Sequence, residues 1–227
     1  IKKIEEKITS KTVAMLIVHL YGKGCDMDEI IDISDKFGLK IIEDCAHAIG
    51  TKFNKTHVGN FGETGCFSFY PTKNLTTFEG GMIITNNEAK SKILKKLRNH
   101  GGIVRNVHEY IGYNSRLDEL HAEILLQKLR HLDKYITRRQ YLAEKYDLML
   151  KDTDLIIPEV MDGNKHAYYL YVVRHTQRNS IIKELKKKKN VNFLAGSSIT
   201  SISNSNSKVV SFSNNKLRLR KDLSLIH

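Results

Sequence analysis

The amino-acid sequence predicts an α/β fold with a mostly parallel central sheet and flanking helices. An apolar run at 13–20 indicates a buried strand, a helical pattern follows from Asp26 to Gly38, and a second short apolar run occupies 39–42. Strand, helix and strand at this spacing form a βαβ unit, whose two strands lie parallel. These observations predict a sheet with helices packed on its faces.

The helix of this unit has clear start and stop signals. Asp26 followed by Glu29 matches a capping box, in which side chains satisfy free backbone N–H groups at the first turn. Ile30 and Ile33 belong to its apolar face. Gly38 is expected to end the helix, and the preceding residues 1–10 have the pattern of an amphipathic helix end.

Further helices and strands follow the same periodicity arguments. A polar, glycine-punctuated stretch is expected to form a hairpin, and the later apolar patterns alternate between helical and extended types. The expected elements are a hairpin-like segment at 50–65, a strand at 82–85, helices at 87–101 and 117–151, a strand at 166–174 and a helix at 180–189.

The strongest functional candidate lies in the stretch GCFSFYPTKNLTTFEGG at 65–81. The apolar run Phe67–Tyr70 indicates a buried strand that Pro71 ends, because proline cannot donate a hydrogen bond to a β-ladder. Lys73 follows at this strand-to-loop corner. A held and partly desolvated amine is suited to Schiff-base chemistry, whereas a lysine taken alone is more often a solvated surface group.

Composition excludes several classes of protein. No apolar run among the 227 residues approaches the ~20 needed to span a bilayer, and no signal-peptide pattern opens the sequence, so we expect a cytoplasmic protein. The three cysteines lack CxxC spacing and the histidines are scattered, which predicts no metal site. The net charge of +12 permits nucleic-acid binding, but no recognition motif accompanies it.

Four stretches stand out in order along the sequence: VHLYGKGCDMDEI, IIEDCAHAIG, FSFYPTKN with its Gly-Gly turn, and RNHG followed by IGYNSRLDELHAEIL. Together they resemble the DegT/DnrJ/EryC1/StrS family of sugar aminotransferases. The similarity covers about residues 1–150 and continues more weakly through HAYYLYVVR. Each motif alone is a weak signal, whereas four in the expected order are a strong one.

The resemblance implies the pyridoxal-phosphate-dependent transferase fold of type I and assigns roles to site residues. Lys73 would hold pyridoxal 5'-phosphate covalently, and Asp44 would keep the pyridinium nitrogen protonated. His47 would lie near the ring hydroxyl and Ser68 would bind the phosphate. Taken alone, Asp44 could be a capping or solvated acid, His47 a half-buried histidine, and Ser68 a small polar residue on a sheet face.

Asn114 carries the implication for assembly. In the family, the asparagine at this place reaches the phosphate of the neighbouring subunit's cofactor, so the resemblance implies a homodimer with a shared active site. The alternative is that Asn114 caps the helix that follows it, a role that asparagine often fills.

The resemblance also predicts the domain organisation. Residues 1–151 would form the large cofactor-binding domain, incomplete at its N-terminus because the family has a preceding portion with a phosphate-binding Gly-Thr loop. Residues 152–190 would form part of a small α+β domain, and the serine- and asparagine-rich residues 191–227 a diverged or disordered tail.

The implied reaction moves an amino group from an amino-acid donor, by analogy glutamate, to a nucleotide-linked keto-sugar. Such sugars serve cell-surface polysaccharides or secondary metabolites. Three alternatives remain: a truncated and inactive relative, a sugar dehydratase of the same family, and a basic nucleic-acid-binding protein. The dehydratases carry histidine in place of the lysine, so Lys73 argues against that class. The class of sugar and the carbon that is aminated stay open.

Overall fold

The computed structural model describes residues 2–187 and 208–212, which divide into two compact units. Unit 1 comprises the chain up to Arg138 together with Met161–Tyr169, and unit 2 comprises Arg139–Val160 and the described residues from Leu170 onward. In chain order the elements are α1 (Lys2–Glu5), β1 (Ala14–Val18), η1 (Leu20–Gly22), α2 (Met27–Phe37), β2 (Lys40–Asp44), β3 (Lys52–Phe53), β4 (Thr56–His57), β5 (Thr64–Ser68), β6 (Gly81–Ile84), α3 (Glu88–Leu97), α4 (Glu119–Leu129), α5 (Leu132–Leu150), β7 (Tyr171–His175), α6 (Arg178–Lys187) and β8 (Lys208–Phe212).

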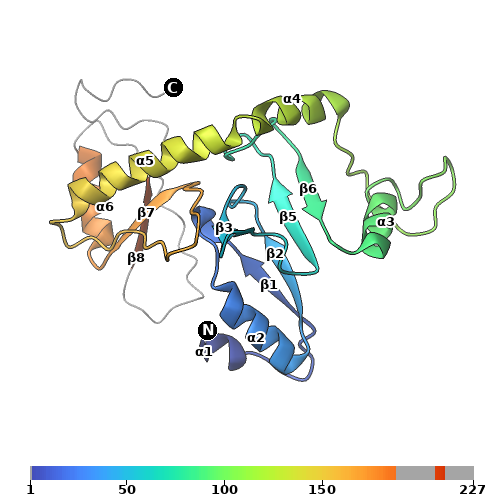
Figure 1. Cartoon of the computed structure of the whole chain (residues 1–227), viewed down its shortest axis with the longest axis horizontal. Helices are drawn as coiled ribbons and strands as arrows, with labels where there is room; N and C mark the ends of the chain where they lie inside the picture. The colour runs from blue at the N-terminus through green and yellow to red at the C-terminus, as the bar shows by residue number, and fades with distance from the viewer. Residues whose placement is uncertain (1, 188–207, 213–227) are drawn as a thin grey trace. The chain divides into compact units, whose positions relative to one another are not determined.

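Unit 1 is built on a four-stranded sheet in the order β1-β2-β5-β6 (Figure 1). The first three strands are parallel, and β6 pairs antiparallel with β5. The predicted α/β class with a mostly parallel sheet is therefore confirmed. The expected hairpin is also present, as the antiparallel pair β3 and β4.

Helix α2 covers one face of this sheet. Its buried side chains Ile30 and Ile33 pack in one cluster with Met15 and Ile17 of β1. The predicted caps are present: the Asp26 carboxylate accepts a hydrogen bond from the backbone N–H of Glu29, and Gly38 adopts the left-handed conformation at φ 62°. This packing follows from the alternation of side chains along β1.

The opposite face of β1 is open in the described structure. Leu16 and Val18 point to this face, and their side chains are 66% and 42% exposed. In the parallel register, Val18 is paired with Asp44 at the end of β2. The open face therefore carries the apolar side chains Leu16 and Val18 together with the candidate site residue Asp44.

Several predicted elements differ from the observed ones, and three of the differences have a clear description. The strand expected at Phe67–Tyr70 begins earlier and ends at Ser68, because β6 pairs only as far as that residue. The helix expected over 117–151 is two helices, α4 and α5, with a break at residues 130–131. The strand expected from His166 begins only at Tyr171, since the residues before it form a turn in which Tyr168 has a positive φ of 44°.

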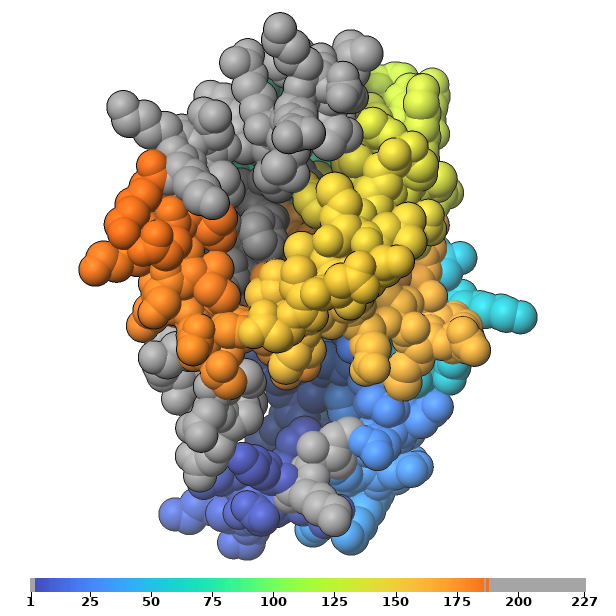
Figure 2. All heavy atoms as spheres, turned by 90° about the vertical axis from the view of Figure 1, so that its left-hand side faces the viewer, coloured from blue at the N-terminus to red at the C-terminus, as the bar shows by residue number. Residues whose placement is uncertain are grey.

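Unit 2 contains an antiparallel pair, β7 and β8, together with α6 and the later part of α5. The hydroxyl of Tyr171 donates to Asp147 of α5 at 2.5 Å, and His175 contacts Asp154 at 2.7 Å. Helix α5 lies at the surface in Figure 2, and its side chains Leu148 and Met149 are exposed. The prediction for residues 191–227 falls outside the described residues except at β8.

None of the described helices is long and apolar enough to cross a membrane.

Candidate active site

Asp44 and Ser68 lie on the same face of the sheet, at the carboxyl ends of neighbouring parallel strands. Asp44 is the last residue of β2 and pairs with Cys66 of β5, and Ser68 follows Cys66 by two residues. Because side chains two residues apart point to the same face, both are on the face opposite to Glu43. Ligands in parallel sheets bind at these carboxyl ends.

Lys73 lies in a loop that the backbone of Phe69 closes. The N–H of Phe69 donates to the carbonyl of Gly80 at 2.9 Å, and its carbonyl accepts from the N–H of Thr77 at 3.1 Å. A further turn is formed where the N–H of Lys73 donates to the carbonyl of Tyr70 at 2.9 Å. Since the Phe69 side chain is buried in the core, the loop that carries Lys73 is anchored at its base.

Lys73, His47 and Asp44 are close enough to influence one another's charge. Burial lowers the pKa of the Lys73 amine, and the negative charge of Asp44 partly offsets this effect. Burial also lowers the pKa of His47 to about 4; the charge of Lys73 adds to the decrease and Asp44 opposes it. At neutral pH, His47 is therefore an uncharged imidazole beside a carboxylate and an amine.

Tyr169 belongs to the same group of side chains, although the sequence analysis did not select it. Its ring stacks on the His47 ring with the centroids 4.3 Å apart and the planes at 25°. The Lys73 Nζ lies over the Tyr169 ring, 4.9 Å from its centroid. The aromatic run at 168–171 was assigned to a strand, and strand periodicity contains no signal for a contact with a residue nearly a hundred positions earlier.

Asn114, the last candidate residue, is exposed. Its backbone forms an isolated antiparallel bridge with Asn99, just beyond α3. The interpretation of Asn114 as a helix cap is wrong, because Asp118 is the N-cap of α4 and its carboxylate accepts from the N–H of Leu120 at 2.9 Å. The role toward a neighbouring subunit's cofactor stays a prediction.

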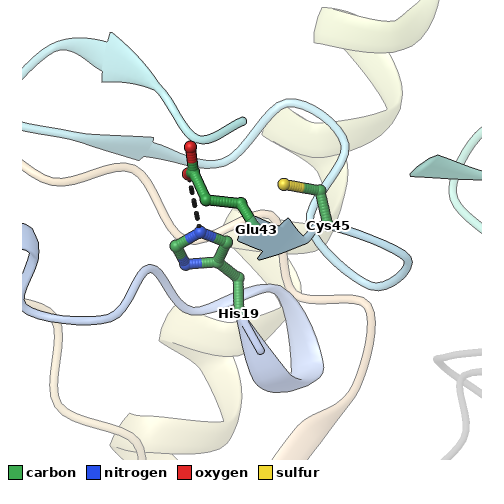
Figure 3. Close-up of side chains that lie close together, drawn as sticks. All are labelled: His19, Glu43 and Cys45. Atoms are coloured by element: carbon green, nitrogen blue, oxygen red, sulfur yellow. Dashed lines mark hydrogen bonds and ion pairs between the residues drawn. The ribbon is translucent and has the colours of Figure 1, made fainter. Parts of the chain in front are cut away.

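Glu43 and His19 form a buried pair (Figure 3), and Glu43 is the residue of β2 that precedes Asp44. His19 Nε2 lies 3.0 Å from Glu43 Oε2, and both side chains are fully buried. His19 Nδ1 accepts from the backbone N–H of Cys25 at 3.1 Å, so Nε2 carries the proton and donates to Glu43. The backbone N–H of His19 also donates to the carbonyl of Asp44 at 3.1 Å, which ties β1 to the end of β2.

Among the described residues, His19, Glu43 and Cys45 are grouped closely enough to be tested as metal ligands. Both nitrogens of His19 are engaged, and the Glu43 oxygens accept further hydrogen bonds from Gly59, Phe61 and Gly62. Burial, together with the charge of Glu43, raises the pKa of the Cys45 thiol. The hydrogen bonds of His19 and Glu43 make this a structural hydrogen-bonding centre, in which both imidazole nitrogens and both carboxylate oxygens are engaged within the chain.

The chemistry of the donor set fits pyridoxal phosphate. Asp44 offers a carboxylate for a pyridinium nitrogen, and the rings of His47 and Tyr169 offer flat surfaces beside the amine of Lys73. Ser68 offers a hydroxyl, whose oxygen accepts from the backbone N–H of Tyr70 at 3.3 Å and retains its proton for a phosphate. The residues present at these strand ends thus match the functional groups of the cofactor.

Comparisons with curated proteins give relatives that include transaminases of nucleotide-linked sugars. The chain is 42% identical over 189 residues to a dTDP-3-amino-3,4,6-trideoxy-alpha-D-glucose transaminase of Micromonospora megalomicea subsp. nigra, covering 81% of the chain and 50% of the relative. It is 45% identical over 179 residues to a dTDP-3-amino-3,6-dideoxy-alpha-D-galactopyranose transaminase of Aneurinibacillus thermoaerophilus, covering 78% of the chain and 49% of the relative. The chain spans about half the length of these curated relatives.

Solved structures of similar proteins have the same fold. DesV of S. venezuelae, solved in complex with a ketimine intermediate, matches 92% of this chain and 62% of its own with a TM-score of 0.83 and 33% identity. A DegT DnrJ EryC1 StrS aminotransferase from Brucella abortus matches 93% of this chain and 61% of its own, with a TM-score of 0.81 and 28% identity. The profile of the DegT/DnrJ/EryC1/StrS aminotransferase family matches residues 1–199. The chain belongs to the DegT/DnrJ/EryC1/StrS aminotransferase family.

Proposed function

We propose that this chain is the catalytic part of a pyridoxal-phosphate-dependent aminotransferase that moves an amino group from an amino acid, by analogy glutamate, to a nucleotide-linked keto-sugar. The observation that carries the proposal is the convergence of Asp44, His47 and Lys73 at the carboxyl ends of β2 and β5. The names of two relatives, which are transaminases of dTDP-linked sugars, support the class of substrate.

Lys73 would carry out both the attachment and the proton transfer. When bound, pyridoxal phosphate supplies an electron sink that stabilises negative charge on the substrate carbon next to the amino group. The Nζ of Lys73 would hold the cofactor and, once released, would take the proton from that carbon as general base. Because burial lowers the pKa of this amine, a larger fraction of it is unprotonated and able to accept a proton.

The other site residues would bind and orient. The carboxylate of Asp44 would hold a proton on the ring nitrogen, and the uncharged His47 ring would stack beside the cofactor or hydrogen-bond its hydroxyl without adding positive charge. The hydroxyl of Ser68 would donate to the phosphate. These roles place the negative Asp44 at the ring nitrogen and Lys73 at the reacting carbon.

We also propose a homodimer in which Asn114 of one subunit completes the site of the other. The segment around Asn114 exposes a run of apolar side chains that is large for a solvated loop, and a second copy of the chain is the partner we assign to it. Those side chains are Ile103 at 64%, Val104 at 66%, Val107 at 50%, Ile111 at 98% and Tyr113 at 69% exposed.

The test of the function is covalent trapping of the cofactor. Pyridoxal phosphate is added, a visible absorbance band is sought, and borohydride reduction followed by peptide mapping locates the label. We expect a stable band and a label on Lys73, and we expect Lys73→Ala to lose both and to abolish amino transfer. Lys92→Ala, which removes an exposed lysine of α3, is the matched control and should behave as the parent.

Label spread over surface lysines, or equal in the parent and Lys73→Ala, would refute the role of Lys73. The absence of any band would favour the inactive-relative interpretation for this chain. Binding to arbitrary DNA that weakens steeply with salt would instead favour the nucleic-acid interpretation suggested by the net charge of +12.

A further inference from the structure

Lys73 is held on both sides by hydrogen bonds to one distant segment, Ala167–Tyr169. The residue before it, Thr72, has its hydroxyl 2.9 Å from the hydroxyl of Tyr169. The residue after it, Asn74, donates from Nδ2 to the carbonyl of Ala167 at 3.0 Å. The backbone of Lys73 is therefore flanked by two contacts to the same three-residue segment, and both contacts lie within unit 1.

The side chain of Lys73 meets the same segment through the ring of Tyr169. Its Nζ lies 4.9 Å from the ring centroid, which is within the range of a cation–π contact. The same ring stacks on His47 at 4.3 Å, so its orientation is determined by the stack and by the hydroxyl contact with Thr72. A ring held at two points is a fixed surface on which a flexible lysine side chain can rest.

The segment Ala167–Tyr169 packs closely against the turn at Gly22 and is hydrogen-bonded to it. The backbone N–H of Ala167 donates to the carbonyl of Gly22 at 2.9 Å. A Cβ at Gly22 would lie 2.8 Å from the backbone nitrogen of Tyr169 and 3.0 Å from that of Tyr168, so the two backbones touch. Tyr168 has φ 44°, a conformation that the surrounding contacts must maintain. Such local rigidity is typical of a segment that positions another group.

We propose that Tyr169 is a positioning residue of the active site, whose ring holds the Lys73 ammonium in place and stabilises its charged form. The contact between the ring and the amine is argued from the geometry alone. That the amine so held belongs to an aminotransferase active site rests on the proposed function. The substrate or cofactor need not touch Tyr169 for this role.

The charged and titratable groups around Lys73 set the expected direction of the effect. The negative charge of Asp44 favours the charged form of the amine, whereas burial opposes it. His47, whose pKa is lowered to about 4, carries no charge at the pH values where a lysine titrates. The face of the Tyr169 ring is electron-rich and adds to the stabilisation of the ammonium. Replacing this ring by an aliphatic side chain keeps the surroundings apolar and removes that stabilisation, so the amine should lose its proton at lower pH.

The test is a pH profile of Lys73 acylation in the full chain without added cofactor. Trace acetic anhydride reacts only with unprotonated amines, and peptide mass spectrometry follows each lysine separately. The midpoint of the profile reports protonation, and the plateau at high pH reports accessibility. In Tyr169→Leu we expect the midpoint to move to lower pH, giving about threefold faster acylation of Lys73 below the midpoint. Tyr169→Phe keeps the ring and should keep the midpoint.

A matched control removes an unrelated ring. Lys145 lies over Tyr141 at 4.8 Å in unit 2, so Tyr141→Leu should leave the Lys73 midpoint unchanged. An unchanged or raised Lys73 midpoint in Tyr169→Leu would overturn the proposal, because general loosening of the loop admits water and raises the midpoint instead.

A second comparison applies if Tyr169→Leu does not fold. Pentafluorophenylalanine at position 169 has the shape of phenylalanine but an electron-poor ring face, so relative to Tyr169→Phe it should lower the Lys73 midpoint; equal midpoints would overturn the proposal. The proposed function is tested separately, by trapping of pyridoxal phosphate on the parent. If trapping fails while the acylation profiles behave as expected, the proposed function is wrong and the positioning role of Tyr169 is still supported.

Discussion

At the scale of single residues, Glu43 shows how a buried charge can support a site that it does not enter. Its carboxylate accepts from His19 and from the backbone N–H groups of Gly59, Phe61 and Gly62, at 2.6–3.0 Å. Burial opposes ionisation of Glu43, but these hydrogen bonds outweigh it, and the pKa is lowered. Because Asp44 is the next residue along β2, this centre also determines where the candidate ring-binding carboxylate lies.

Glu43→Gln should therefore be strongly destabilising. The amide of glutamine presents N–H groups to backbone donors, and breaking a buried hydrogen-bonded pair costs about 3–5 kcal/mol. The measurement is the free energy of unfolding in urea at neutral pH. Glu63→Gln is the control, because Glu63 is partly exposed and pairs with Lys40 and Lys90; its loss should cost at most about 1 kcal/mol.

The free energies of unfolding of the parent and of Glu43→Gln should depend differently on pH. The folded-state pKa of Glu43 lies below its ordinary value of 4.5, so its stabilisation is present above pH 4.5 and is lost as the pH falls toward the folded-state value. The difference in free energy of unfolding between the parent and Glu43→Gln should thus become smaller in acid. A difference that is small at neutral pH, or that widens on acidification, would contradict the assignment of a charged Glu43.

At the scale of elements, the turn η1 brings segments together that are far apart in the sequence. Tyr21 and Gly22 both have positive φ, at 61° and 93°, and the carbonyl of Gly22 accepts from Ala167 and from the Thr51 hydroxyl. Glycine is needed at position 22 for two reasons, its left-handed backbone and the absence of room for a Cβ. This one position controls how closely the Tyr169 segment approaches the site.

Gly22→Ala should displace the Tyr169 segment and lower the stability by about 3 kcal/mol or more, because backbone strain and a backbone clash combine. Thermal unfolding gives the stability, and the Lys73 acylation profile reports the displacement. Gly38→Ala is the matched control: Gly38 also has a positive φ, but its Cβ would meet nothing within 4 Å, so only a strain of about 1–2 kcal/mol is expected. If Gly22→Ala and Gly38→Ala lose the same stability, the expected clash between a Cβ at position 22 and the Tyr169 segment contributes nothing, and the prediction is wrong.

Helix ends and helix interiors differed in how well local sequence predicted them. The caps Asp26 and Gly38 were predicted because capping depends on neighbouring residues only. The break between α4 and α5 was missed, since the leucines keep helical spacing across it and no glycine or proline stands at Arg130 or His131. Buried contacts of Leu125 and Leu132 in one cluster accompany the break, and these are tertiary interactions.

At the scale of the whole molecule, the proposed shared site makes a prediction about mixed assemblies. The backbone bridge of Asn114 is formed with Asn99 and not with the residues around Lys73. The side chain of Asn114 is exposed. A second subunit is the proposed route by which it reaches a cofactor. In a mixed dimer, a chain lacking only Lys73 can lend its Asn114 to a chain lacking only Asn114.

Co-expression of Lys73→Ala with Asn114→Ala should therefore restore cofactor trapping at one site of each mixed dimer. Each variant alone should trap pyridoxal phosphate weakly or not at all, because Lys73 supplies the bond and Asn114 a phosphate contact. The measurement is the borohydride-fixed label per chain, with co-expressed parent and Lys73→Ala as the reference. If mixing restores nothing although mixed dimers form, each site is contained within one chain and the shared-site proposal is wrong.

The sequence by itself determined the α/β class, the helix caps at Asp26 and Gly38, and the hairpin, because each of these depends on periodicity or on neighbouring residues. Its ordered motifs also indicated the family that the comparisons then showed. Only the tertiary structure decided that Tyr169 meets Lys73 and that His19 and Glu43 form one buried centre. Such contacts join residues that are distant in sequence, so they depend on how strands pair and how backbones pack, which local patterns do not encode.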